Sequence, residues 1–335
     1  MNNSLFVVVA LLFGLVPSKS LADAKAELQH PAWKDEMLAT PMPEWPQVPI
    51  SEEESARGRR LFAKMFMAAG QARTGTFEGS DVEIITFPGK AKNKRRRSHW
   101  SISFDRPKNW VRLRREKDTR IFQFARNGKE ALFRLTFNNS PAPRSIHRHP
   151  VGWDKMMPEA KPLDFRFAGV GFAFGFCNGL DVEDWRKRLQ VSLVPHLVGI
   201  SEDPNGHVAL LFEQTTGRPF RCVIWLDSHE HTRFIQNAQW ERDASEPSVW
   251  KVNHTSRTTW QTIGDVTVPT QIREVVDQTV LRSMEVNLHW TMVNEALPKE
   301  SVSFESFDLP PGTQVINHKS GKRALESIIG QPQSP

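Results

Sequence analysis

Residues 119–137 read TRIFQFARNGKEALFRLTF, and this stretch decides how the chain around it folds. Its side chains follow a period of two on both sides of Asn127-Gly128, a pair that favours the tight turn of a two-residue β-hairpin. We therefore expect paired strands at 119–126 and 131–137. This hairpin predicts an antiparallel sheet as the framework of the chain.

The same period of two predicts more strands on both sides of the hairpin. They are expected at 76–87, 98–104, 110–115, 191–198, 207–214, 218–226, 234–242, 250–262, 266–276 and 280–292. Residues 138–163 form an irregular stretch that contains Pro and His. The connections are short enough for neighbouring strands to pair, so we expect a mainly β (α+β) fold. Its centre is one large curved antiparallel sheet, a half-barrel.

Two helices are expected beside this sheet. Ser51 and Glu54 fit a capping box. Apolar side chains then recur at three- and four-residue steps as far as Gly70, which predicts a helix over 52–69. A shorter amphipathic helix is expected at 182–189, and the sheet should wrap over both.

The beginning of the chain is typical of a secretory signal peptide, residues 1–22. Residues 5–16 form an apolar run that is too short for a bilayer core, which needs about 20 residues. Pro17 ends the run, and Ser20-Leu21-Ala22 offers small residues for cleavage. We expect an exported protein of the periplasm or cell envelope that is soluble after cleavage. A short membrane anchor is the alternative.

Residues 23–50 are expected to be a Pro-rich leader. Five prolines fall within residues 31–49, which argues against a helix or an interior strand there and predicts an extended, solvated tether. No linker divides the chain that follows. We expect a single sheet-based domain at 51–325 and a flexible tail at 326–335.

The composition excludes several classes of protein. With 39 % hydrophobic and 24 % charged residues, the 335-residue chain is not a low-complexity disordered protein. Its mean hydropathy of −0.46 excludes a multi-span membrane protein. It has 21 Phe and 11 Trp but no Tyr, so no mechanism can use a tyrosine. Its two cysteines, Cys177 and Cys222, form either a disulfide or two buried thiols.

Catalytic signatures are absent from the sequence. There is no Gly-x-Ser-x-Gly elbow, no phosphate-binding loop and no His-Glu-x-x-His, so we expect a non-enzymatic protein without a cofactor. The best metal candidate is Asp227 with His229 and His231, because two His two residues apart share one face of an extended segment. A solvated turn is the alternative there. His147 and His149 form a second, weaker pair.

A run of cations is the sharpest local charge feature, and we expect it at a hairpin tip. Such a run could contact anionic lipid headgroups or another polyanion, or it could be a solvated loop that keeps a sheet edge from pairing. The exported location argues against nucleic acid. The residues are Lys90, Lys92, Lys94, Arg95, Arg96 and Arg97.

Residues 165–176 alternate Phe with small residues. On a strand, Phe172, Phe174 and Phe176 would share one face, which suits either the wall of a hydrophobic cavity or an ordinary core. Trp225 and Trp290 are further candidates for inward positions on later strands. All five are candidates for lining a ligand cavity.

Several short motifs occur in an order that resembles a known family. After the helix at 52–69 come TFEG at 76–79, FDRPKNWVR at 104–112 and the hairpin at Asn127-Gly128. The carboxyl half adds LDFRFAGVG at 163–171, CVIWLD at 222–227, VTVPT at 266–270 and VNEALP at 293–298. Over residues 50–320 the chain resembles an enlarged, diverged secreted member of the LolA-like periplasmic lipoprotein-carrier superfamily.

This resemblance implies a helix followed by a curved antiparallel sheet that wraps round a hydrophobic cavity. It also implies a non-enzymatic protein whose partner is a lipid or lipoprotein acyl chain. Two alternatives remain open from the sequence: a structural envelope protein with a filled core, and a secreted metal-dependent enzyme that uses Asp227, His229 and His231.

Overall fold

The structure is a computed structural model, and it describes most of the chain between residues 29 and 330. No helix within the described residues is long and apolar enough to cross a membrane. The described ranges are 29–90, 93–117, 119–137, 145–150, 193–203, 206–215, 219–228, 232–243, 245–246, 248–307, 309–319 and 322–330.

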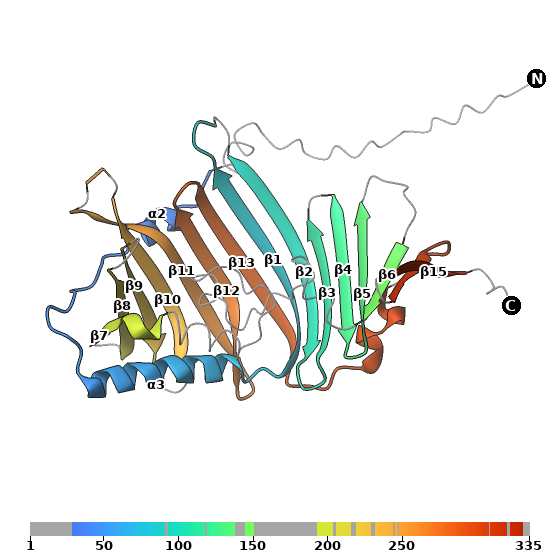
Figure 1. Cartoon of the computed structure of the whole chain (residues 1–335), viewed down its shortest axis with the longest axis horizontal. Coiled ribbons are helices and arrows are strands. Elements are labelled where there is room, and N and C mark those ends of the chain that lie inside the picture. Colours follow the sequence, from blue (N-terminus) through green and yellow to red (C-terminus); the bar gives the residue numbers. More distant parts are fainter. Residues whose placement is uncertain are drawn as a thin grey trace, which may run out of the picture.

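Strands dominate these residues (Figure 1). The first six are β1 (Thr74–Thr86), β2 (Lys94–Asp105), β3 (Trp110–Lys117), β4 (Arg120–Asn127), β5 (Glu130–Phe137) and β6 (Ser145–Pro150). The next seven are β7 (Leu197–Glu202), β8 (His207–Gln214), β9 (Phe220–Asp227), β10 (Arg233–Arg242), β11 (Trp250–Ile263), β12 (Val266–Asp277) and β13 (Leu281–Val293). The last two are β14 (Gln314–Lys319) and β15 (Lys322–Ile328).

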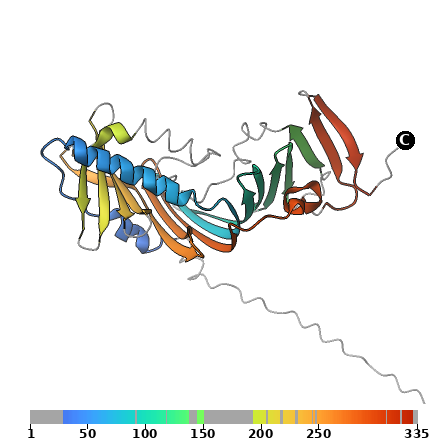
Figure 2. The same ribbon diagram turned by 90° about the horizontal axis from the view of Figure 1, so that it is seen from below.

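Short helices accompany the strands. The α-helices are α2 (Trp33–Leu38) and α3 (Glu52–Ala69), and the 3-10 turns are η4 (Val194–His196), η5 (Lys299–Val302) and η6 (Phe304–Phe307). All strands belong to one sheet in the order β15-β14-β6-β5-β4-β3-β2-β1-β13-β12-β11-β10-β9-β8-β7. The sheet is open and curved (Figures 1 and 2), which confirms the predicted mainly β fold.

The hairpin that decided the prediction forms as expected. β4 and β5 pair from Arg120 opposite Phe137 to Arg126 opposite Ala131. In the turn, the side-chain oxygen of Asn127 accepts hydrogen bonds from the backbone N–H groups of Lys129 and Glu130, at 3.1 and 3.2 Å. Gly128 has φ +82°, a conformation that glycine adopts without a steric cost.

The edge beyond β5 differs from the prediction. β14 pairs with β6 in parallel, so the sheet is not wholly antiparallel. β6 lies within 138–163, which we expected to be irregular, and β15 runs into the expected tail as far as Ile328. β6 also pairs with β5, and β14 and β15 form a hairpin, whereas the pairing of β14 with β6 joins segments far apart in the chain.

Helix α3 begins at the predicted capping box and covers one face of the sheet, which we call the inner face (Figure 2). The Ser51 hydroxyl accepts from the backbone N–H of Glu54, whose carboxylate accepts from the backbone N–H of Ser51. Phe62, Met65 and Phe66 pack with apolar side chains of β8, β9 and β10. These contacts close the inner face at this end of the sheet.

The leader is not a solvated tether. Residues 29–50 cross the opposite face, which we call the outer face. His30 contacts the hydroxyls of Ser283 and Thr86 at 2.7 and 2.9 Å. At the far end of the leader, the Trp45 indole N–H donates to Glu213 at 3.1 Å. The leader therefore packs on strands from β1 and β13 to β8.

The leader also contains a helix, contrary to the prediction. Pro31 stands before α2 and Pro41 after it, so these prolines bound the helix instead of interrupting it. Met37 of α2 is buried, and α2 contacts β11 and β12. Figure 2 shows α2 and α3 on opposite faces of the sheet.

Candidate functional site

The inner face of β1–β5, β12 and β13 carries a continuous set of aromatic and apolar side chains. Register places Phe77 opposite both Ile102 and Trp290, so these three share the inner face. We call the set around them the inner wall. Its larger members are Phe77, Trp100, Ile102, Phe104, Leu113, Phe122, Phe124, Phe133, Leu288 and Trp290.

Aromatic rings at the centre of the inner wall hold one another in place. The ring centroids of Phe77 and Trp290 are 4.5 Å apart, and Phe104 meets Trp290 edge-on at 6.2 Å. The Trp290 indole N–H donates to the backbone carbonyl of Pro269 at 2.8 Å. Gly75 lets the indole approach, because a Cβ atom there would lie 2.9 Å from the ring. The Trp290 indole thus contributes carbon surface with its polar atom already satisfied.

The described helices cover only part of the inner wall. On the inner face, α3 contacts β7, β10 and β12. η5 contacts β3 and β4, and Phe307 of η6 packs with outer-face side chains. Within the described residues, no helix lies over the inner face of β2–β5 (Figure 2). At β5 the wall continues in Leu135 and Phe137, each 41 % exposed.

One end of the inner wall is cationic. The Arg115 guanidinium lies 4.6 Å over the Trp100 ring, and Arg120 lies 5.4 Å over Phe137. Burial lowers the pKa of both Arg115 and Lys117, and for Lys117 the neighbouring arginines lower it further. These groups sit where their charge is poorly solvated, so an anion placed beside them would be favoured.

A buried carboxyl group lies among these cations. Trp100 donates its indole N–H to Asp81 at 2.6 Å, and Asp81 is buried. Burial raises the pKa of Asp81, while the charge of Arg115 opposes that rise. Among the described residues, the acids that act on Arg115 and Lys117 are Asp81 and Glu83. With Arg120, the three described cations outnumber these two acids.

A chain of ion pairs joins the two halves of the inner face. His254 on β11 contacts Glu274 on β12 at 2.9 Å, and Glu274 accepts from Arg282 on β13 at 3.2 Å. Arg282 lies 3.7 Å from Glu83 on β1, which pairs with Arg96 on β2 at 3.3 Å. From Glu274 to Arg96 this ladder alternates in charge across four strands, β12, β13, β1 and β2, which favours their register.

The basic run lies only partly at the predicted hairpin tip. Lys90 is in the turn after β1, where its backbone N–H donates to the Phe87 carbonyl at 3.1 Å. β2 begins at Lys94, so Lys94 to Arg97 extend a strand instead. Register places Lys94 and Arg96 on the inner face and Arg95 and Arg97 on the outer face. Lys92 lies outside the described residues. The strand tolerates this run because long cationic side chains keep their charged ends at the surface and pair across strands.

Comparison with known proteins gives matches only among solved structures. No protein-family model and no curated protein matches the chain. A LolA superfamily protein from Nitrosomonas europaea is 12 % identical, with 75 % of this chain and 99 % of that chain covered and a TM-score of 0.38. A putative outer membrane lipoprotein-sorting protein domain from Vibrio parahaemolyticus is also 12 % identical, with 75 % and 98 % covered and a TM-score of 0.38.

A third structure, a DUF1329 family protein from Desulfovibrio piger, is 12 % identical, with 76 % of this chain and 99 % of that chain covered and a TM-score of 0.37.

The predicted cavity residues are distributed over both faces. Trp290 belongs to the inner wall. Trp225 was predicted to point inward, which is wrong: it is partly buried on the outer face, 6.3 Å from the ring of Trp240. The leader covers the sheet there, so the outer face of β9 also needs apolar side chains. Phe172, Phe174 and Phe176 lie outside the described residues and stay predictions.

The predicted metal cluster at 227–231 is only partly described. Asp227 accepts a hydrogen bond from Arg233 at 2.5 Å, while His229 and His231 lie outside the described residues. Cys222 is buried beneath α3, and burial raises the pKa of its thiol to about 12. Cys177 lies outside the described residues, so a bridge to it stays a prediction.

Proposed function

We propose that this is an exported cell-envelope protein that binds the acyl chain of a lipid or lipoprotein along its inner wall. The observation that carries the proposal is the aromatic wall itself, which extends past α3 to the exposed side chains Leu135 and Phe137. Aromatic rings whose N–H groups are satisfied add apolar contact area without leaving a polar group unpaired.

Simple energetics favour an amphiphile over a wholly apolar ligand. Each methylene group that leaves water for such a wall contributes about 0.8 kcal/mol. Arg120 and Lys117 at one end could attract an anionic headgroup, at about 1 kcal/mol for each cation near a charged group. The apolar wall and the cationic end therefore suit a single ligand with an acyl chain and an anionic head.

The same wall would also serve a structural envelope protein with a filled core. Its central side chains are buried, as they would be in either case. The two functions differ in what the protein does with an added acyl chain. A fluorescent fatty-acid probe, titrated into the purified protein after lipid extraction, separates them.

The test uses neighbouring residues of β5 that face opposite sides of the sheet. Leu135 faces inward, because it pairs with Phe122 of the inner wall, whereas Thr136 faces outward. We expect Leu135→Glu to weaken probe binding about tenfold, since it places a charge against an acyl chain. Thr136→Glu is the matched control and should bind as the unmodified protein does.

Thermal unfolding of both variants checks that the sheet is intact. Absence of saturable probe binding by the unmodified protein would reject the proposal in favour of a structural role. Equal loss in the Leu135 and Thr136 variants would also count against a site on the inner face.

A further inference from the structure

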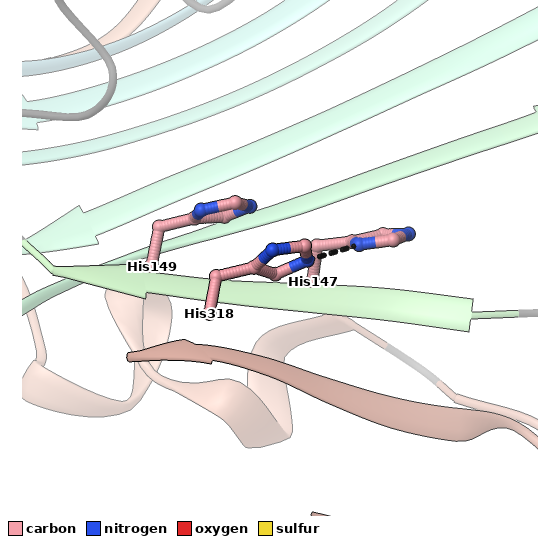
Figure 3. A group of neighbouring side chains, drawn as sticks. All are labelled: His147, His149 and His318. Carbon is pink, nitrogen blue, oxygen red and sulfur yellow. Dashed lines mark hydrogen bonds between the residues drawn. The ribbon is translucent and has the colours of Figure 1, made fainter. Parts of the chain in front are cut away.

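Three histidines meet at the seam between β6 and β14 (Figure 3). His147 Nδ1 and His318 Nε2 are 2.9 Å apart, and the rings of His149 and His318 stack with centroids 4.0 Å apart. Each ring offers one nitrogen such that all three nitrogens lie within 4.8 Å of one another. The three side chains project from the same face of the two strands.

Strand geometry and topology bring the three rings together. His147 and His149 share a face because they are two residues apart on β6. The parallel pairing sets Asn317 beside Arg148, so the next residue, His318, reaches the gap between the two histidines of β6. His147 and His318 are 171 positions apart in the sequence. The cluster therefore exists only when the carboxyl-terminal hairpin is docked on the sheet.

The neighbouring groups prepare the cluster for a cation. Ser145 Oγ lies 3.1 Å from His147 Nε2, which holds that ring with Nδ1 turned toward His318. Burial, more than any other cause, lowers the pKa of His149, to about 4. The neutral form of imidazole is the one that binds a metal ion.

Arg323 is a charged neighbour of the cluster, since it pairs in register with His318 and lies on the same face. Burial is the largest cause that lowers the pKa of His147 and of His318, and the charge of Arg323 lowers both further. Arg148 points to the outer face, where it pairs with Glu130 at 2.8 Å and also with Glu326. Among the described residues, Arg323 is the arginine whose charge acts on these rings, and it lies on the terminal strand β15, at the open edge of the sheet.

We propose that His147, His149 and His318 bind a divalent transition-metal ion, with Zn²⁺ as the reference ion. Three imidazoles with a fourth position left for water form a familiar zinc ligand set, whereas Ca²⁺ and Mg²⁺ prefer oxygen ligands. Tetrahedral zinc with bonds of 2.0–2.1 Å needs nitrogens about 3.4 Å apart, so small side-chain rotations complete the site.

The metal would hold the carboxyl-terminal hairpin, β14 and β15, against β6. β14 meets β6 over four residue pairs, the only parallel pairing among the described strands. An ion held by both strands adds a bond across this short junction that does not depend on the backbone ladder. This role is independent of acyl-chain binding, so either proposal can fail without the other.

The test measures zinc binding by the full chain after a chelator has removed any bound metal. Competition with a chromogenic chelator should show one ion per chain, with a Kd of about 1 μM or tighter. Cobalt substitution should give the intense visible absorption of a four-coordinate site. His318→Ala should weaken zinc binding more than about 100-fold, and Ser145→Ala, which removes only the supporting hydroxyl, about tenfold.

The matched control is His289→Gln, since His289 is an exposed strand histidine away from the cluster. It should leave the affinity unchanged. Circular dichroism checks the fold of each variant, and His149→Gln replaces His318→Ala if the latter unfolds. Lack of stoichiometric zinc binding would overturn the proposal, as would an affinity that survives both histidine substitutions.

Discussion

The two halves of the sheet are stabilised differently. From β7 to β12 the sheet has cover on both faces, with α3 inside and the leader outside. From β2 to β6 the described cover is on the outer face, where η6 packs, and the inner face carries the aromatic wall. Within the described residues, the first half thus has cover on both faces and the second half on its outer face, which leaves its inner wall as the surface to which the proposed function applies.

The covered half should depend most strongly on α3. Phe66 is buried against β8 and β9, and Phe66→Ala should lower the free energy of unfolding by about 4 kcal/mol, because it leaves a cavity under the helix. Denaturant unfolding measures the loss. Hydrogen exchange should show faster opening of β8 and β9 than of β4 and β5.

Met67 provides the control for this helix, because it is the next residue and 71 % exposed. Met67→Ala should change the stability by less than about 0.5 kcal/mol. If Phe66→Ala opened all strands equally, the two halves would be a single cooperative unit and the contrast between them would not hold.

The leader, which covers the outer face of the same half, should contribute somewhat less to the free energy of unfolding. Trp45 packs on the outer face beside Val223 and Trp240, and its indole N–H donates to Glu213. Trp45→Ala should therefore lower the free energy of unfolding by about 3 kcal/mol, because it removes a buried aromatic side chain. The loss of a solvated side chain would have little effect. Val48→Ala is the control, since Val48 in the same leader is 74 % exposed. A negligible loss of stability in the Trp45 variant would mean that the leader is a solvated tether after all.

This contrast explains which parts of the fold could be predicted from the sequence. The hairpin at Asn127-Gly128 and the capping box at Ser51 and Glu54 are local features, and both form as predicted. The run CVIWLD at 222–227 is apolar on both sides because the sheet is covered on both faces there. Without alternation, nothing in the sequence decided which way Trp225 points.

The candidate sites follow the same division. Trp290 could be placed inward because β13 alternates at its carboxyl end, where His289 and Thr291 are exposed. His147 and His149 could be paired from their spacing, but His318 could not join them, since its position depends on a parallel pairing between distant segments. A pairing between segments so far apart leaves no signal in the sequence of either strand alone.

The smallest expected effect concerns the cationic end of the wall and is seen in how stability depends on pH. Asp81 is a buried carboxyl group whose pKa burial raises above its ordinary value of 3.8. Its protonated form is thus favoured by folding. Its contribution is complete below pH 3.8 and is lost as the pH rises through the raised pKa. Compared with Asp81→Asn, the unmodified protein should lose stability as the pH increases from about 4 toward neutrality.

Denaturant unfolding of both proteins over this pH range, with a chelator present throughout, measures the difference between them. Arg115, the Ser98 hydroxyl and the Trp100 indole face the carboxyl group, and all three oppose the effect of burial. A difference that stayed constant with pH would mean that these partners cancel the effect of burial. A difference of the opposite sign would mean that Asp81 is held as a carboxylate. In that case the cationic end already has its anion, and the headgroup of a bound lipid would have to lie elsewhere along the wall.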